Sequence, residues 1–253
     1  MEAAPVTHSG EMKTLGIVGG IGPESTIEYY RFILDGYRAR VPDPPSHEAT
    51  ARQTGSAPHL IIDSLDVNHG IALLDANDLA GLTDYISESV ERLARAGAEL
   101  ALIAANSPHL VFDAVQQRSP VPLLSIVQAA CDHARGLGSK RLGLLGTGFT
   151  MRERFFPDVF DRAGLELVTP RADEQASIHE KYIHELLKNQ FLPETRSTIL
   201  GIIERMRDDE HIEALLLAGT ELPLLLRGAE PEGMAFLDTT LIHVKAAVDA
   251  ILR

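Results

Sequence analysis

Short apolar runs alternate with longer amphipathic segments along almost the whole chain. The apolar runs are bounded by glycine, proline or polar residues, which is typical of buried strands. Seven strands are therefore expected, at residues 15–20, 60–63, 100–106, 122–127, 141–147, 165–170 and 214–220. Apolar residues recur at helical spacing in the segments 24–34, 78–96, 125–137, 173–189 and 193–207. Strands and helices in alternation predict the α/β class, with parallel sheets covered by helices.

Local sequence signals mark several ends of these elements. Pro23 is suited to a first helical turn, and Gly97 and Gly138 fall where helices are expected to stop. Residues 41–58 are rich in proline, serine and threonine, which predicts a surface loop that could cover a site. Residues 1–12 are expected to form a flexible N-terminus.

A faint internal repeat predicts two similar halves. Residues 16–26 resemble 143–153, each an apolar run followed by a glycine-rich turn and a helix, and residues 99–107 resemble 212–220. We therefore predict two α/β domains related by a pseudo-two-fold axis. The first would contain residues 13–119 plus 221–253, and the second residues 120–220. Ligands of parallel α/β units bind outside the carboxyl ends of the strands, so an active-site cleft is expected between the domains.

The charge balance narrows the classes of partner. The chain has 36 acidic and 23 basic side chains and a formal charge of −13, without a basic cluster, which argues against nucleic acid. No apolar run approaches the roughly 20 residues of a membrane span, and residues 1–12 lack the pattern of a secretory signal. A cytoplasmic protein without a membrane partner is expected. Cys131 is the single cysteine, so a disulfide framework is excluded.

The turn after the first strand could receive an anion. Its backbone N–H groups and the following helix dipole suit a carboxylate or phosphate. The dinucleotide fingerprint is incomplete, because Gly20 and Gly22 are not followed by a third glycine. A tight turn without a ligand is the alternative.

Two further turns carry polar side chains directly after strands. Asn106 and Ser107 follow one strand, and Thr220 follows its counterpart in the repeat. Each hydroxyl could instead be a helix cap, but the recurrence at matched strand ends favours a shared pocket for a compact anionic ligand.

Two titratable residues in these turns are candidate proton carriers. His109 could act as a general acid or base, or be a first-turn histidine bonded to a backbone carbonyl. Glu221 could act likewise, or simply benefit from a helix dipole. The segment around His179 and His184 lacks the His-Glu-x-x-His spacing of zinc peptidases, so we expect no metal site.

Taken together, several motifs resemble the aspartate racemase branch of the cofactor-independent aspartate/glutamate racemase family. The resemblance runs from about Lys13 to the C-terminus. It rests on LGIVGGIGPESTIEYY, IIDSLDVN, ALIAANSPHLVFD, GLLGTGFTM, AGTELPLLL and FLDTTLIHVKAAV. It implies two similar α/β domains, a homodimer, a small amino acid or carboxylate as substrate, and proton transfer without any cofactor. In this family two cysteines on opposite faces of the substrate act as base and acid.

The chain departs from the family pattern at both of those cysteines. The resemblance places them at Ala105 and Gly219, and neither a methyl group nor a hydrogen atom can accept a proton. Cys131 lies inside a predicted helix and is expected to be a small buried thiol. Two-thiol racemisation is therefore excluded for this sequence.

The resemblance also suggests which residues would hold a substrate. It places Lys188 near a substrate carboxylate, and puts Asn68 in a loop where family aspartate racemases use an arginine, which disfavours a substrate with a distal carboxylate. The residues that it places in the substrate cradle are Gly22, Asn106, Ser107, Thr147, Thr150, Thr220 and Glu221.

Two functions remain open at this point. The chain could be an isomerase, lyase or decarboxylase-like enzyme for a small carboxylic or amino acid, with His109, Glu221 or Lys188 carrying protons. It could instead be a catalytically silent relative that binds such an acid. Engineered removal of two cysteines is a third reading, for which glycine at position 219 would be an odd choice.

Overall fold

The structure is a computed structural model that describes residues 12–41 and 57–253. Its strands form two four-stranded sheets in which all neighbouring strands are parallel. The first sheet has the order β2 (Leu60–Ser64), β1 (Leu15–Gly19), β3 (Leu100–Ile103) and β4 (Leu123–Leu124). The second has the order β6 (Glu166–Val168), β5 (Arg141–Gly146), β7 (Ala214–Ala218) and β8 (Ala235–Asp238). The predicted α/β class with two parallel sheets is confirmed.

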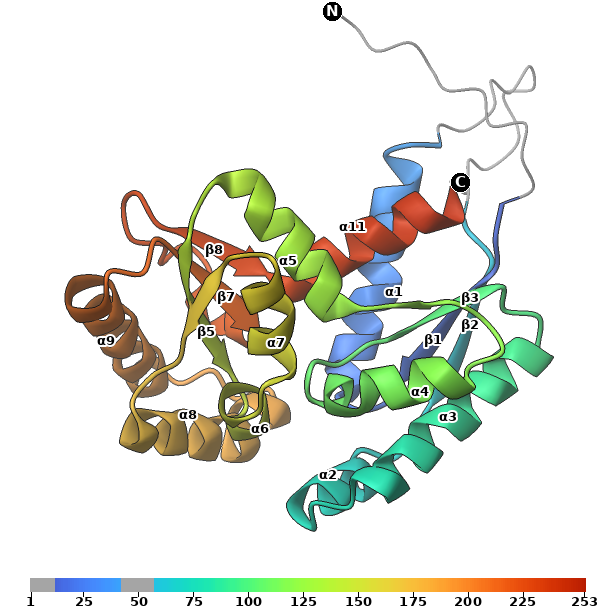
Figure 1. Cartoon of the computed structure of the whole chain (residues 1–253), viewed down its shortest axis with the longest axis horizontal. Coiled ribbons are helices and arrows are strands. Elements are labelled where there is room, and N and C mark those ends of the chain that lie inside the picture. The colour runs from blue at the N-terminus through green and yellow to red at the C-terminus, as the bar shows by residue number, and fades with distance from the viewer. Residues whose placement is uncertain (1–11, 42–56) are drawn as a thin grey trace, which may run out of the picture.

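Helices connect the strands and cover both sheets (Figure 1). The α-helices are α1 (Pro23–Arg38), α2 (Val67–Asp75), α3 (Leu79–Arg95), α4 (Phe112–Arg118), α5 (Ile126–Leu137), α6 (Gly148–Arg152), α7 (Phe155–Arg162), α8 (Ala172–His184), α9 (Pro193–Glu210), α10 (Leu222–Leu226) and α11 (Thr239–Ile251). Two 3-10 helices are η1 (Ser107–Val111) and η2 (Leu186–Lys188). No helix in the described ranges is long and apolar enough to cross a membrane.

All seven strands expected from the sequence are present, and the five expected helices correspond to α1, α3, α5, α8 with η2, and α9. Gly97 and Gly138 follow α3 and α5 with φ angles of 103° and 81°, which glycine adopts without strain. The sequence analysis did not identify β8 or the helices α2, α4, α6, α7 and α10, which have nine residues or fewer and carry little periodicity. It also did not identify α11, which has 13 residues. Residues 1–11 and most of the proposed loop at 41–58 lie outside the described residues.

The sheet order explains the internal repeat. β1 and β5 occupy the same position in their sheets, and so do β3 and β7. These are the four strands that the repeated sequence segments form. The repeat therefore corresponds to two copies of one strand arrangement.

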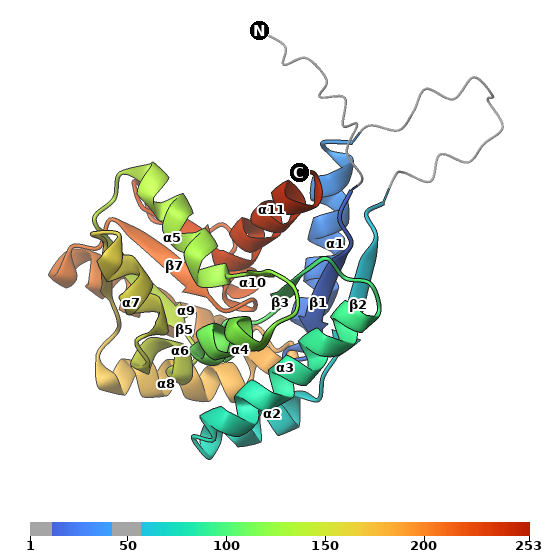
Figure 2. The ribbon, with the colours of Figure 1, turned by 45° about the vertical axis from the view of Figure 1, so that its right-hand side comes forward.

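Strand pairs cross both of the expected domain boundaries, at 119/120 and 220/221. β4 pairs with β3 in the first sheet, and β8 pairs with β7 in the second. The chain crosses between the sheets at Ser125 and Asp238, which cap the N-termini of α5 and α11 with their side chains. Helix α11 then returns to pack beside α1, as Figures 1 and 2 show.

Alternating residues of each buried strand pack against helices on opposite faces of the sheet. In the first sheet Ile17 contacts the core that α1 and α11 cover, whereas Val18 faces the core under α3. In the second sheet Leu145 belongs to the core under α8 and α9, and Leu144 to the core under α5 and α7. Burying each such side chain contributes roughly 1.5–3 kcal/mol, so these four apolar layers fix the positions of the strand ends.

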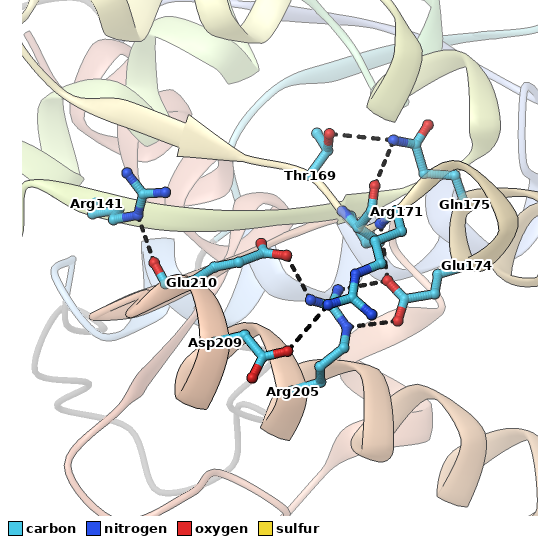
Figure 3. A network of polar contacts seen from close by, with 9 residues as sticks. Arg141, Thr169, Arg171, Glu174, Gln175, Arg205, Asp209 and Glu210 are labelled. Carbon is cyan, nitrogen blue, oxygen red and sulfur yellow. Dashed lines mark hydrogen bonds and ion pairs between the residues drawn. The ribbon is translucent and has the colours of Figure 1, made fainter.

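An ion-pair network holds α8, α9 and the end of the second sheet together (Figure 3). Arg205 of α9 donates to Glu174 Oε1 at 2.6 Å and pairs with Glu210 at 2.5 Å, and its side chain is only 16% exposed. Glu174 in turn accepts the backbone N–H of Arg171 at the start of α8. Because α8 carries part of the pocket described below, this network helps to position that pocket.

Replacing Arg205 by methionine should lower the free energy of unfolding by about 1–3 kcal/mol, because Glu174 and Glu210 would lose a largely buried cationic partner. The matched control is Arg154→Met, whose ion pairs with Asp158 and Asp161 are exposed to solvent and should leave stability close to that of the wild type. Urea unfolding measures both. Equal effects of the two substitutions would contradict the structural role of Arg205.

Candidate functional site

The carboxyl ends of β1, β3, β5 and β7 open onto one pocket of about 70 Å³ between the two sheets. Residues of all four strand–helix turns line it: Ile21 and Gly22, Ala105 to Pro108, Thr147, and Ala218 to Glu221. Both sheets therefore contribute to this pocket, and its polar groups come from turns whose positions the strands fix.

Three hydroxyl groups join the two domains at this pocket. Ser107 Oγ, from the turn after β3, lies 3.0 Å from Thr147 Oγ1 and 3.4 Å from Thr150 Oγ1, both from the turn after β5. Thr147 caps α6 by accepting the backbone N–H of Thr150. Thr150 is fully buried behind the other two residues, so Ser107 and Thr147 are the members that line the pocket.

Asn106 carries an unused hydrogen-bond donor. Its side chain is 5% exposed and its Oδ1 lies 3.3 Å from the hydroxyl of Thr239, which also donates to the Leu217 carbonyl at 2.9 Å. Its Nδ2 has no hydrogen-bond partner among residues 12–41 and 57–253. A buried donor without a partner costs about 1–3 kcal/mol, and this residue lines the pocket, so a bound acceptor there would remove that cost.

The space above Gly219 is filled by Tyr182 of α8. A β carbon at residue 219 would lie 2.8 Å from Tyr182 Cε2 and 2.9 Å from Cζ, and closer still to the hydroxyl oxygen. Real β carbons essentially never approach other atoms so closely. A side chain at residue 219 would therefore require the tyrosine ring to shift, whereas the backbone φ of Gly219 lies outside the left-handed region.

The Tyr182 hydroxyl donates a hydrogen bond to Glu221 Oε2, and the Thr220 hydroxyl donates to the same oxygen at 2.8 Å. Burial raises the pKa of Tyr182 well above its usual value near 10, and the negative charge of Glu221 raises it further, while contacts with the Glu221 backbone and the Thr220 hydroxyl lower it. Tyr182, Thr220 and Glu221 are all buried and line the pocket. The phenol is consequently neutral at physiological pH.

The other wall of the pocket is apolar. Val67, Ile71 and Leu74 line it from one face of α2, at helical spacing, and Phe149, Ile183 and Leu187 line it from the second domain. Glu221 is the one charged residue in the lining that the described chain provides. The pocket thus combines a polar end at the strand termini with an apolar end under α2.

The structure gives His109 a structural position behind the pocket. Its Nδ1 donates to the Ala105 carbonyl at 2.9 Å, and its Nε2 accepts the backbone N–H of Ile126 at 3.1 Å. Both ring nitrogens are therefore occupied, the side chain is 3% exposed, and it does not line the pocket. The hydrogen bond to a backbone carbonyl is one of the two alternatives that the sequence left open for His109. Together the two hydrogen bonds join the turn after β3 to the start of α5.

A second buried histidine lies next to it. His243 of α11 contacts Tyr29 Oη through Nδ1 and the Leu124 carbonyl through Nε2, and its ring centroid is 6.2 Å from that of His109. Burial lowers the pKa of His109 to about 3, with the neighbouring His243 contributing, and burial lowers the pKa of His243 to about 4. Both rings are therefore neutral in the folded protein near pH 7.

Two other residues suggested by the sequence lie away from the pocket. Lys188 is exposed at the end of η2, and its neighbour Leu187 lines the pocket. Asn68 is exposed in the first turn of α2, and its neighbour Val67 lines the pocket. In both cases the adjacent apolar residue is the one that turns inward. These positions follow from helix direction, which a single sequence does not reveal.

The sequence analysis considered His179 for a metal site and Cys131 as a thiol, and both make contacts within the fold. His179 Nδ1 accepts the backbone N–H of Gly148, and Cys131 is buried in α5 with its Sγ 3.9 Å from the Val159 carbonyl oxygen. Within the described residues no group of three or more histidine, cysteine, aspartate or glutamate side chains is arranged to hold a metal. Tyr182 lies in this same histidine-containing helix, and its part in the pocket was missed because no sequence signal links it to Gly219.

These observations define a two-domain α/β protein with a pocket between matched strand ends. The family model for Asp/Glu/hydantoin racemase matches residues 18–247, so the chain belongs to this family. Membership supports an Asp/Glu racemase-like function.

Solved structures and a curated relative agree with this assignment. A putative Asp/Glu racemase from Yersinia pestis is 28% identical, with a TM-score of 0.83 over 96% of this chain and 100% of that chain. An aspartate racemase homologue from Pyrococcus horikoshii OT3 is 31% identical, with a TM-score of 0.77 over the same shares. The broad specificity amino-acid racemase RacX of Bacillus subtilis is 21% identical over 94% of this chain and 98% of its own.

The buried histidines predict a specific pH dependence of stability. The unfolded chain binds protons at these residues below pH 6.5, whereas the folded chain does not until about pH 4 and 3. The unfolded state thus binds more protons in this window, and the free energy of unfolding should fall as the pH drops from 6.5, by up to about 1.4 kcal/mol per pH unit for each histidine. Urea unfolding between pH 7 and 4.5 measures the slope.

The variant His243→Gln should show a shallower slope over this range, because one of the two titrating groups is absent. His133→Gln is the control, since His133 is exposed on α5 and should leave the slope unchanged. An unchanged slope in the His243 variant would contradict the neutral, buried state of this histidine.

Proposed function

We propose that the pocket binds a small carboxylic or amino acid and that the chain acts on it as an enzyme without the two-thiol mechanism and without a cofactor. The observation that carries this proposal is the buried, unpaired Nδ2 of Asn106 at the pocket. A carboxylate oxygen is a strong acceptor for such a donor, and a hydrogen bond to a charged group contributes about 1.5–3 kcal/mol.

Other groups at the same end of the pocket favour an anion. The hydrogen-bonded pair of Ser107 and Thr147 supplies a hydroxyl donor. Gly22, which lines the pocket, is the N-cap of helix α1 and has no side chain. The positive end of the helix dipole is therefore directed at this region, where a carboxylate is stabilised. We place the substrate carboxylate at Asn106, Ser107 and Gly22, and the 2-amino group of an amino acid toward Glu221, the one charged residue in the described lining.

The apolar end favours a substrate with a small apolar side chain over an acidic one. An acidic side chain under α2 would lie among Val67, Ile71 and Leu187, with no cationic partner in the described lining. Burying an unpaired carboxylate costs far more than burying a methyl or ethyl group. We therefore propose an apolar 2-amino or 2-hydroxy acid as the substrate class, within a family named for acidic amino acids.

The residues at positions 105 and 219 set the mechanism apart from two-thiol racemisation. Ala105 and Gly219 line the pocket from different sheets, and neither side chain can carry a proton. A catalytically silent protein that binds the same acid is the second candidate, favoured by the inert Ala105 side of the pocket. Whether the α-proton of a bound acid exchanges separates the two candidates.

The proposal also includes a cytoplasmic location and a homodimer. Both rest on the resemblance to the family, together with the acidic composition. Light scattering coupled to size exclusion checks the dimer: a monomeric mass at micromolar concentration would contradict it.

Binding is tested by protein NMR with both enantiomers of alanine, 2-aminobutyrate, valine and aspartate as probes. We expect saturable shifts with the apolar acids, and weaker binding of aspartate. Asn106→Ala should weaken binding 10- to 100-fold, because it removes a hydrogen bond to a carboxylate.

Asn68→Ala is the matched control and should bind like the wild type, because Asn68 is exposed outside the pocket. Equal losses in the two asparagine variants would contradict the part given to Asn106. Tighter binding of aspartate than of 2-aminobutyrate would contradict the proposed substrate class.

A further inference from the structure

The place of a side chain at residue 219 is taken by the hydroxyl group of another residue. Tyr182 reaches this space from α8, and its oxygen lies closer to the ideal β-carbon position of residue 219 than any other heavy atom does. In this family the resemblance assigns residue 219 to a proton-carrying cysteine. The phenol therefore brings an O–H group to the position from which a cysteine side chain would act.

We infer that Tyr182, hydrogen-bonded to Glu221, is the proton carrier of this protein and that it acts on one face of the substrate only. This inference rests on the proposed binding of a small carboxylic or amino acid in the pocket. It depends on three observations: the clash that a β carbon at residue 219 would make with the tyrosine ring, the hydrogen bond from Tyr182 to Glu221, and the position of both side chains in the lining.

The proton step uses the tyrosine as a relay. The Cα–H bond of the substrate breaks, and its electron pair stays on the substrate as an enediolate. The proton forms a new O–H bond with Tyr182 Oη while the phenol's own proton moves to Glu221 Oε2. Glu221 thus changes from carboxylate to carboxylic acid and the phenol remains neutral, and the reverse step restores all groups.

Neutrality suits Tyr182 to this part. Burial and the charge of Glu221 raise its pKa, so a lasting phenolate is disfavoured, but a relay never requires one. The Thr220 hydroxyl donates to the same Glu221 oxygen and holds it in place for the transfer. Glu221 thus acts as the base, and the Tyr182 phenol passes the substrate proton to it.

Among the described residues, no comparable group lines the pocket beside Ala105. Ala105 presents a methyl group, and its neighbours in the lining are Asn106, Ser107 and Pro108, which do not titrate in the physiological range. The proton can therefore leave and return on the Tyr182 side only. We expect exchange of the α-proton with retention of configuration, because inversion needs a second carrier on the other face.

The experiment follows the α-proton of each enantiomer of 2-aminobutyrate and valine by NMR in D₂O, with chiral chromatography of the products. Hydroxyl and carboxyl protons exchange with D₂O, so deuterium should appear at Cα without the other enantiomer. Tyr182→Phe and Glu221→Gln should each slow this exchange at least 100-fold while binding of the acid changes less than 5-fold. Tyr37→Phe is the matched control: this buried tyrosine bonds Met12 Sδ, far from the pocket, and exchange should be unchanged.

The outcomes separate this inference from the proposed function. Exchange that survives in Tyr182→Phe, or that is accompanied by racemisation, would overturn the part given to Tyr182 and leave the binding proposal intact. Binding without any exchange in the wild type would overturn it in favour of a silent binding protein. Absence of binding by every probe would overturn the proposed function, and this inference with it.

Discussion

The ring of Tyr182 occupies the space that a side chain at residue 219 would need, and the site depends on this steric constraint. A β carbon there would approach two ring carbons to within 3 Å. The glycine therefore admits the phenol, and the phenol brings Glu221 into the pocket through their hydrogen bond. The hydroxyl group of Tyr182, from α8, thus occupies the space beside Gly219.

This constraint operates because the two sheets are held in a fixed relation. Ser107, Thr147 and Thr150 join the turns after β3 and β5, and His109 joins the first domain to the start of α5. Helix α11 connects the second sheet back to α1, as Figure 2 shows. A pocket formed by four strand ends keeps its shape only while these contacts between domains persist, so the neutral state of the buried histidines is part of the site's support.

Hydrophobic periodicity was sufficient to predict the strands and longer helices, because burial on sheet faces imposes it residue by residue. It also located the turns that line the pocket, since parallel strands end at one edge. It could not give side-chain direction: His109 turns behind the pocket, and Lys188 and Asn68 face solvent beside lining residues. Tyr182 escaped prediction because its contact with Gly219 joins α8 to the end of β7, and no local pattern records such a long-range contact. The sequence also did not show to which sheet β4 and β8 belong, because strand pairing is a tertiary contact.

The most direct test of the central claim is the energetic coupling between residues 182 and 219, measured by urea unfolding of Gly219→Ala, Tyr182→Leu and the double variant. In the wild type the added methyl group meets the tyrosine ring, so Gly219→Ala should destabilise the fold by about 1–3 kcal/mol. In the Tyr182→Leu background the ring is absent and the same substitution should cost little, which gives a coupling of at least about 1 kcal/mol. Additive effects of the two substitutions would contradict the claim that Tyr182 occupies the space of a side chain at residue 219.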